Sequence, residues 1–468
     1  MTDSILYWNQ VALDAAKADF ASPDPATKSD PQQPGPTYAA RALAIVHLAM
    51  YDAYVGVKCA GNPATYLTYP AKPCTNDLST AQAAVAAAAT LTLTAVFSRQ
   101  RETFLKKQAE FLLLLPDHDP KIAAGLAWGA TVAARMLDDR KGDGSDAPND
   151  QYAPSTEPYR HRVDPLNPGQ GFLGPLWGKV KPFGFNNLQT AIAPLPDPVT
   201  LPEYVAHYNE VLGKGRDQGG TRTLDETTIG LFWAYDGARN IGVPPRLYNQ
   251  VVRAIVEKKG GVTEAQNAKL FAMVNAAMAD AGIQAWHEKY KHNFWRPVVG
   301  IRESDAGWGP TGLGDGKGAA TPGNPYWQPL GAPRTNSSGP SSFTPNFPAY
   351  PSGHAAFGTA ALRVTQQALA LPDNFAFEFV SDELNGENVG ATGVRPRHKR
   401  PLTIHSAIEE NVLSRVYLGV HWQLDGRKGE QIGNDKTSEH HQKPCATDHD
   451  RNSPQRLSQR HSIRVVTK

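Results

Sequence analysis

Three separated segments of the chain carry side chains that could do chemistry. Each segment joins positive charge or histidine to a turn or a helix end, and the residues concerned are Lys289 and Arg296, then Ser352, Gly353 and His354, then Arg415, His421 and Asp425. Together they supply three cations, a hydroxyl, backbone N–H groups at a helix start and two imidazoles. These groups suit a tetrahedral or trigonal-bipyramidal oxyanion with several negative charges.

Each segment alone has an ordinary structural explanation. Lys289 and Arg296 are seven residues apart at the end of a predicted helix, so two turns would place them on one face, and such faces are often only solvated. Ser352 stands where a helix N-cap is expected. The anion hypothesis depends on joint occurrence, because Gly353 would let an anion approach the backbone and Asp425 would orient the imidazole four residues before it.

The three segments together resemble a known signature. The patterns are Lys-x6-Arg-Pro, Pro-Ser-Gly-His and Ser-Arg-x5-His-x3-Asp, in that order. They resemble the signature shared by vanadium-dependent haloperoxidases and the type 2 phosphatidic-acid phosphatase superfamily. The segments WAYDGARNIGVPPRLYNQVVRAIV, FPAYPSGHAAFG and RVYLGVHW are similar to fungal-type vanadium chloroperoxidases and favour the haloperoxidase branch. This resemblance covers most of residues 201–426 and, more weakly, the amino-terminal helices.

The resemblance implies a role for each matching position. His421 would be the axial ligand of vanadium, and Asp425 would lie behind it. His354 would act as the acid–base group, and Lys289 would also hydrogen-bond the activated peroxide. The vanadate oxygens would accept hydrogen bonds from Lys289, Arg296, Ser352, Gly353 and Arg415.

Three further residues receive supporting roles from the same resemblance. Asp236, in the AYDGA stretch, resembles the carboxylate that pairs with the position of Arg415, although a simple turn aspartate is as good an interpretation. Phe347 and Trp286 fall at positions that resemble the aromatic wall of a halide pocket in chloroperoxidases, where an apolar wall would desolvate a small halide. Both aromatics also fit an ordinary core.

The function implied is that of a vanadate-dependent haloperoxidase. Vanadate would act as a Lewis acid on hydrogen peroxide, so that a halide is converted to hypohalous acid or an equivalent halogenating species. Bromide is the halide expected first, and chloride is the second candidate. The partners would be hydrogen peroxide, halide and small organic acceptors.

Two alternatives remain open. A soluble acid phosphatase could use the same pocket, with His421 as nucleophile and His354 protonating the leaving group. An oxyanion-binding protein without activity would leave His354 unexplained.

The elements that must position these residues are helical. Apolar residues recur with helical periodicity over residues 39–57, 80–115, 119–140, 202–215, 225–238, 244–260 and 263–295, and strand-like alternation is nearly absent. We predict an all-α fold of two packed helical bundles with long loops, one bundle over about 37–215 and one, with the active site, over about 216–425.

Several segments are predicted to lie outside the bundles. Residues 1–36 are expected to form a polar arm and residues 426–468 a disordered polar tail. The long Gly/Pro-rich segment 304–347 is typical of functional lids or disorder. The basic run RPRHKRP, residues 395–401, is expected to be a solvated loop.

Composition limits the partners and the compartment. The 468 residues carry a formal net charge of +2, which gives no global reason to expect nucleic acid or an anionic membrane as partner. Residues 78–98 are long enough to span a membrane, but their Ala and Thr content favours a buried helix. No signal peptide is visible, so we expect a cytoplasmic protein or export by a non-Sec route. Cys59 and Cys74 could be bridged or free, and no zinc site is evident.

Overall fold

Helices dominate the computed structural model, which describes residues 2–21, 31–61, 63–116, 120–184, 198–337 and 343–442. The α-helices are α1 (Ser4–Ala18), α2 (Pro36–Val57), α3 (Leu78–Val96), α4 (Arg101–Leu112), α5 (Lys121–Asp139), α6 (Tyr204–Lys214), α7 (Leu224–Phe232), α8 (Pro244–Lys259), α9 (Glu264–His292), α10 (Pro297–Glu303), α11 (Gly353–Ala368), α12 (Ile404–Tyr417) and α13 (Gln423–Gln442). The prediction of an all-α fold is confirmed. The predicted division into two bundles at about residue 215 stays a prediction.

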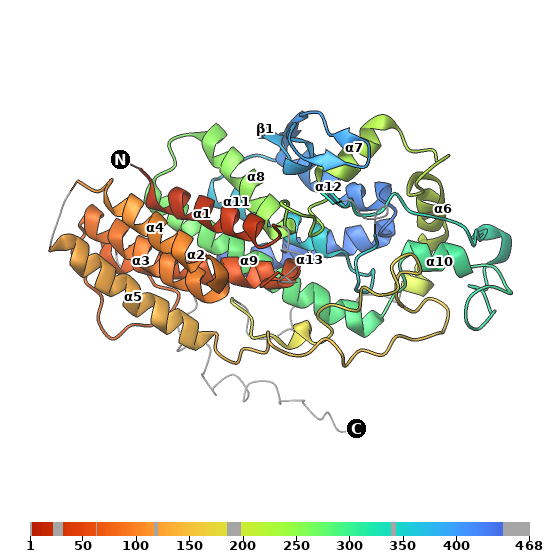
Figure 1. Cartoon of the computed structure of the whole chain (residues 1–468), viewed down its shortest axis with the longest axis horizontal. Helices are drawn as coiled ribbons and strands as arrows, with labels where there is room; N and C mark the ends of the chain where they lie inside the picture. Colours follow the sequence, from red (N-terminus) through yellow and green to blue (C-terminus); the bar gives the residue numbers. More distant parts are fainter. Residues whose placement is uncertain are drawn as a thin grey trace, which may run out of the picture.

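Helices α1–α5 lie together at one end of the molecule, and the long helix α9 runs from them into the other half (Figure 1). Small residues explain the close packing of α3 on α5. A Cβ at Gly129 would lie 2.2 Å from the carbonyl oxygen of Ala84, so the two backbones are in direct contact there. In the described ranges α3 is the one helix long and apolar enough to cross a membrane, and 83% of its apolar window is buried inside the protein. The prediction of a buried helix is confirmed.

The prediction of a loose arm over residues 1–36 is wrong for its first part. Helix α1 lies in the core, where Trp8 and Leu13 are fully buried. The apolar residues Ile5, Trp8, Ala12 and Ala16 recur with helical spacing, so the signal was present in the sequence. Residues 22–30 of the predicted arm lie outside the described residues.

The prediction of a disordered tail from residue 426 is also wrong as far as residue 442. Helix α13 packs along α11, and glycines make this possible. A Cβ at Gly429 would lie 2.3 Å from the carbonyl oxygen of Ser352, and one at Gly433 would lie 2.9 Å from that of Ala356. Polar composition conceals this packing because backbone contact, rather than apolar side chains, closes the interface. Residues 443–468, with Cys445, lie outside the described residues.

Between α11 and α12 the chain makes an excursion over residues 376–403. Strand β1 (Ala376–Val380) pairs antiparallel with β4 (Lys399–Thr403), and β2 (Val389–Gly390) pairs with β3 (Gly393–Val394). The basic run 395–401 is therefore not a solvated loop throughout, since it enters β4. Two of its arginines are held by buried or half-buried carboxylates, Arg395 by Glu383 at 2.6 Å and Arg400 by Glu410 at 2.7 Å.

A disulfide joins Cys59 and Cys74, whose Cα atoms are 5.1 Å apart. It closes the connection between α2 and α3, in the part of the molecule that helices α1–α5 form (Figure 1). The sequence left bridged and free thiols open, and the structure resolves this as a bridge.

Candidate active site

The carboxyl end of α9 carries the first two predicted residues. Lys289 is in the last turn, and Asn293 ends the helix in the left-handed conformation, with φ 52°. Arg296 follows as the N-cap of α10, in extended conformation before Pro297. The seven-residue spacing predicted that the two cations share one helix face. This prediction is wrong, because Lys289 belongs to α9 and Arg296 to the start of α10. The chain reverses at Asn293, and this turn brings them into one buried group.

The amino end of α11 carries the second group. Ser352 is its N-cap and accepts a hydrogen bond from the N–H of Ala355 at 3.5 Å. Its own backbone N–H donates to the carbonyl oxygen of Asp425 at 2.8 Å, so that amide is not free for a ligand, contrary to the sequence analysis. Its hydroxyl proton remains a donor. The N–H of Gly353 lies in the first helical turn, where amides have no intrahelical partner.

Gly353 has a second reason to be glycine. A Cβ there would lie 2.8 Å from Cζ3 of Trp286. Helices α8 and α12 also hold the start of α11 in place. The carbonyl oxygen of His354 accepts hydrogen bonds from Tyr248 Oη in α8 at 2.9 Å and from Asn411 Nδ2 in α12 at 3.0 Å.

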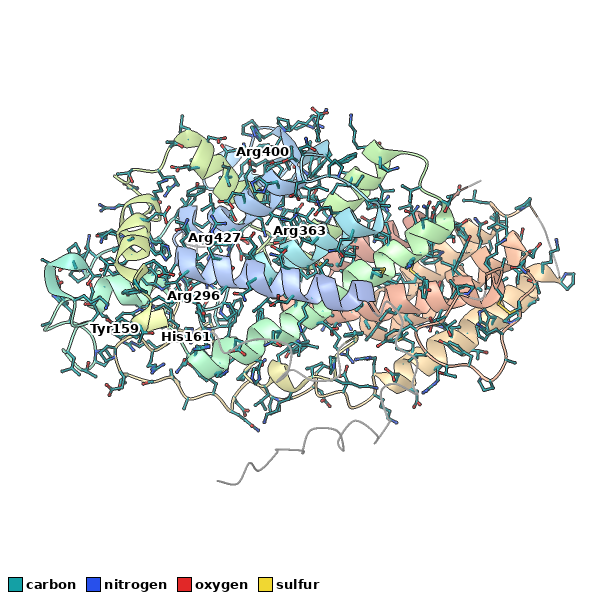
Figure 2. The ribbon with its side chains drawn as sticks, turned by 180° about the vertical axis from the view of Figure 1, so that it is seen from behind. Tyr159, His161, Arg296, Arg363, Arg400 and Arg427 are labelled. Carbon is teal, nitrogen blue, oxygen red and sulfur yellow. A yellow bond between two sulfur atoms is a disulfide. The ribbon has the colours of Figure 1, made fainter. Side chains whose placement is uncertain are left out.

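The corner between α12 and α13 supplies the third group. His421 Nδ1 lies 3.0 Å from Asp425 Oδ2, which accepts its proton, so Nε2 carries the lone pair. That Nε2 is 2.9 Å from Nη1 of Arg296, whose Nε donates to the carbonyl oxygen of Phe347. In Figure 2, Arg296 lies beside the amino end of α13. The spacing of four residues thus makes the pair that the sequence predicted.

A turn after α7 holds two members of the site at once. Arg415 donates to both carboxylate oxygens of Asp236, at 2.9 and 2.8 Å. His354 Nε2 lies 2.6 Å from the carbonyl oxygen of Ala234. Because a carbonyl only accepts, Nε2 carries the proton and Nδ1 is the basic atom. The helix predicted over 225–238 ends at Phe232, and this turn takes its place.

Burial controls the charges of the site. It lowers the pKa of Lys289 well below its usual value, and the nearby Arg296 lowers it further. Burial and the surrounding cations lower the pKa of His354 to about 3 and that of His421 well below its ordinary range, so both imidazoles are neutral at neutral pH. A neutral imidazole is the form that can bond a metal.

Two buried donors of the site have no partner in the described part of the chain, Nη2 of Arg296 and Nε of Arg415. Buried N–H groups of guanidinium ions are rarely left unpaired, since this costs the desolvation penalty. Lys289 differs, because its ammonium already donates to the carbonyl oxygens of Pro348, Ala349 and Pro351. The three basic side chains outnumber the acidic ones, Asp236 and Asp425, and burial raises the pKa of Asp425 to about 7. This donor set fits an anionic oxyanion such as vanadate.

A cavity of about 70 Å³ is lined by Arg415, His421, Gly353 and His354, whereas Lys289, Arg296 and Ser352 are not among its lining residues. One water requires about 10–15 Å³ on this measure, so the space suits small inorganic species. Trp286 and Phe347 line it, with ring centroids 4.6 Å apart. The remaining wall consists of residues that the sequence did not indicate: Pro34, Gly35, Pro36, Leu173, Gly237, Val243, Pro244, Phe343, Pro345, Asn346 and Phe357.

These missed residues belong to segments whose composition gave no sign of their position. Pro34 and Pro36 come from the stretch interpreted as a polar arm, and Phe343, Pro345 and Asn346 lie in the long segment 304–347, whose residues 338–342 lie outside the described residues. Proline-rich composition predicts irregular backbone but not which cavity it borders. The carbonyl of Ala234 is a backbone atom and leaves no signal in the sequence.

Comparison with known proteins agrees with this geometry. The amino-terminal domain of vanadium chloroperoxidase matches residues 1–172, and its second helical-bundle domain matches residues 269–444. Vanadium chloroperoxidase of Curvularia inaequalis is 30% identical over an alignment of 513 residues, covering 92% of this chain and 80% of that protein. The chain belongs to the vanadium chloroperoxidase family.

Solved structures of low sequence identity share the fold. A bacterial vanadium-dependent iodoperoxidase superposes with a TM-score of 0.65 and 17% identity, covering 94% of this chain and 97% of that one. The holo form of a bacterial vanadium-dependent chloroperoxidase gives a TM-score of 0.62 and 17% identity, covering 91% and 97%. At the level of the family, the predictions of a haloperoxidase that uses vanadate, hydrogen peroxide and halide are confirmed.

Proposed function

We propose that this enzyme oxidises bromide, and with greater difficulty chloride, using hydrogen peroxide. The net reaction takes one halide ion, one peroxide and one proton and yields hypohalous acid and water, and the hypohalous acid then halogenates small organic acceptors. The observation that carries the proposal is the pair of unpartnered buried guanidinium donors, Arg296 Nη2 and Arg415 Nε, beside the neutral imidazole of His421.

The chain's own residues would hold the cofactor. His421 Nε2 is the atom that would bond vanadium, since Nδ1 is engaged by Asp425. Arg296, Arg415, the hydroxyl of Ser352 and the N–H of Gly353 would donate to the oxygens of the anion. When bound, vanadate supplies Lewis-acid activation of peroxide. The bidentate contact with Asp236 fixes the plane of the Arg415 guanidinium, so that its Nε is directed without loss of entropy on binding.

The contacts of His354 and Lys289 support a narrower proposal for the role of each. His354 would accept and return the peroxide proton at Nδ1, because Nε2 is committed to Ala234. Lys289 is held by three carbonyls, so it contributes its buried positive charge first and could donate directly only by releasing one of them.

The aromatic wall bears on the halide. Trp286 is fully buried, and Phe347 is nearly so, and both rings also lie about 5 Å from the Lys289 ammonium. A halide arriving between this wall and the cation would lose water while keeping one positive partner, which raises its reactivity. Replacing Phe347 by histidine should therefore reduce the oxidation of chloride more than that of bromide.

The proposed function is tested with metal-free protein and a phenolic reporter. Bromination should appear only after orthovanadate is added, and inorganic phosphate should compete with it. His421→Ala should lose vanadate retention, whereas His354→Ala should retain vanadate and lose halide oxidation. His47→Gln, at a buried histidine in the amino-terminal helices, is the matched control and should keep native vanadate content and bromination at neutral pH. Hydrolysis of a phosphomonoester without any halogenation would instead support the phosphatase alternative.

A further inference from the structure

The turn after α7, residues 233–237, presents two groups to the active site. The carbonyl of Ala234 accepts from His354, and the carboxylate of Asp236 holds Arg415. Between these two residues stands Tyr235. The geometry of one residue therefore sets the direction of a proton-transfer partner and of an anion-binding partner.

The backbone of Tyr235 is in an unfavourable conformation. Its φ is 43°, in the left-handed region that side chains other than glycine, asparagine and aspartate rarely adopt. Such a residue typically costs about 1–3 kcal/mol and persists where its surroundings fix it. The surroundings of Tyr235 are consequently part of the site's construction.

The side chain of Tyr235 is the part that is fixed. It is fully buried, and its hydroxyl accepts a hydrogen bond from the backbone N–H of Asp382 at 2.8 Å and donates to Gln250 Oε1 at 2.9 Å. Asp382 is fixed in turn, because Arg246 donates to its Oδ2 at 2.6 Å. Arg246 also donates to the carbonyl oxygen of Leu13 in α1 at 2.9 Å.

The segment that contains Asp382 is also connected along the chain to Arg415. Ser381 lies directly after β1 and precedes Asp382, and it donates its hydroxyl proton to the carbonyl oxygen of Phe232 at 2.6 Å, at the start of the turn. Strand β1 pairs with β4, whose last residue, Thr403, is the N-cap of α12. Helix α12 carries Arg415. The excursion 376–403 is thus bonded to the turn that holds Asp236 and is continuous with the helix that holds its partner.

We propose that Tyr235 is a positioning residue for the oxyanion site. Through Tyr235, the excursion 376–403 holds in place the turn that carries Asp236. Its hydroxyl ties the strained turn to Asp382 and Gln250, so that Asp236 meets Arg415 in bidentate register. This inference rests on the proposed function only in naming vanadate as the anion, because the contacts themselves would position any tetrahedral oxyanion.

The test measures anion affinity directly rather than turnover. Metal-free protein is titrated with inorganic phosphate and, separately, with orthovanadate in a calorimeter. Tyr235→Phe keeps the ring and removes both hydrogen bonds of the hydroxyl, and we expect about tenfold weaker binding of both anions, as for partners that orient ligand residues. Tyr66→Phe is the matched control, since the Tyr66 hydroxyl also donates to a carbonyl, that of Phe183, and accepts from an arginine, Arg140.

A thermodynamic cycle separates positioning from a general loss of stability. If Tyr235 acts through Asp236, the effect of Tyr235→Phe should shrink to less than twofold in an Asp236→Asn background. A purely structural role would leave the anion affinity of the folded fraction unchanged and would lower only the melting temperature, as Tyr66→Phe should. Anion affinities within twofold of native for Tyr235→Phe would overturn the proposal.

A second pair of variants keeps the proposal open to refutation if Tyr235→Phe does not fold. Gln250→Leu removes the acceptor of the hydroxyl proton, while Gln250→Glu retains an acceptor at the same position but loses the amide N–H that donates to Asp382 Oδ2 at 3.4 Å. Anion affinity should fall with Gln250→Leu and recover in part with Gln250→Glu. Equal affinities in these two variants would contradict the role of the hydroxyl. Normal phosphate binding without vanadate-dependent bromination would refute the proposed function and leave this inference intact.

Discussion

Two helix interfaces of this protein are built in the same way and serve different ends. In the amino-terminal half, Gly129 of α5 contacts the backbone of α3. In the other half, Gly429 of α13 contacts the backbone of α11. The first interface joins two apolar helices and touches no functional group. The second ends at Ser352, whose carbonyl faces Gly429 and whose N–H is bonded to Asp425. The same kind of glycine contact thus joins two helices of the amino-terminal half in one place and fixes the start of the helix that carries Gly353 and His354 in the other.

The largest effect should come from adding a methyl group at the second interface. Gly429→Ala would place a Cβ 2.3 Å from the carbonyl oxygen of Ser352, so α11 or α13 must move. We expect a loss of about 3 kcal/mol in the free energy of unfolding, net of the gain in helix propensity, and at least tenfold weaker vanadate binding. Denaturant melts and equilibrium dialysis would measure the two effects.

Gly129→Ala is the control for that experiment, since its Cβ would meet the Ala84 carbonyl at 2.2 Å. It should cause a similar loss of stability with unchanged vanadate affinity. Equal losses of vanadate affinity in both variants would remove the distinction between the two interfaces.

The disulfide should matter for stability alone. Cys59 and Cys74 close a loop of 15 residues, for which chain entropy gives about 3 kcal/mol. Replacing both cysteines by serine should lower the free energy of unfolding by that amount, without a change in the dissociation constant of vanadate. A weakened site in this variant would show that the amino-terminal helices influence the active site at a distance.

Acid should weaken the amino-terminal half through His47. Burial lowers the pKa of this imidazole to about 4. Its Nε2 lies 2.9 Å from Asn9 Nδ2. In the unfolded chain this imidazole takes up its proton near pH 6.5, well above the folded value. The stability that neutral His47 contributes is therefore fully present above about pH 6.5 and is lost as the pH falls towards 4, by at most about 1.4 kcal/mol per pH unit. His47→Gln should flatten the pH dependence of the unfolding free energy over this window. An unchanged slope would contradict the assignment.

The smallest effect is expected at the ion pair between α13 and α12. Arg427 contacts Glu409, and both side chains are more than a third exposed, at 40% and 36%. Such pairs contribute about 0–1 kcal/mol. Arg427→Met should therefore leave the melting temperature and vanadate affinity nearly unchanged. A large loss would mean that charge rather than glycine contact holds α13 in place.

Sequence reasoning located the apolar helices and the polar signature but not how the chain brings the signature together. The spacing between His421 and Asp425 predicted their contact because four residues make one helical turn. The spacing between Lys289 and Arg296 misled, because a left-handed asparagine, Asn293, ends the helix between them. Helix α13 was missed because hydropathy does not register glycine contacts. The turn at Tyr235 was interpreted as helix, since a positive φ at tyrosine has no sequence signature.

The most direct test of the central claim is a titration of metal-free protein with orthovanadate, followed at once by vanadium content and by bromination rate. The buried donors around His421 predict that both rise together and saturate at one vanadium per chain, and that His421→Ala shows neither. Bromination that proceeds without vanadium, or native vanadium retention in His421→Ala, would contradict the account.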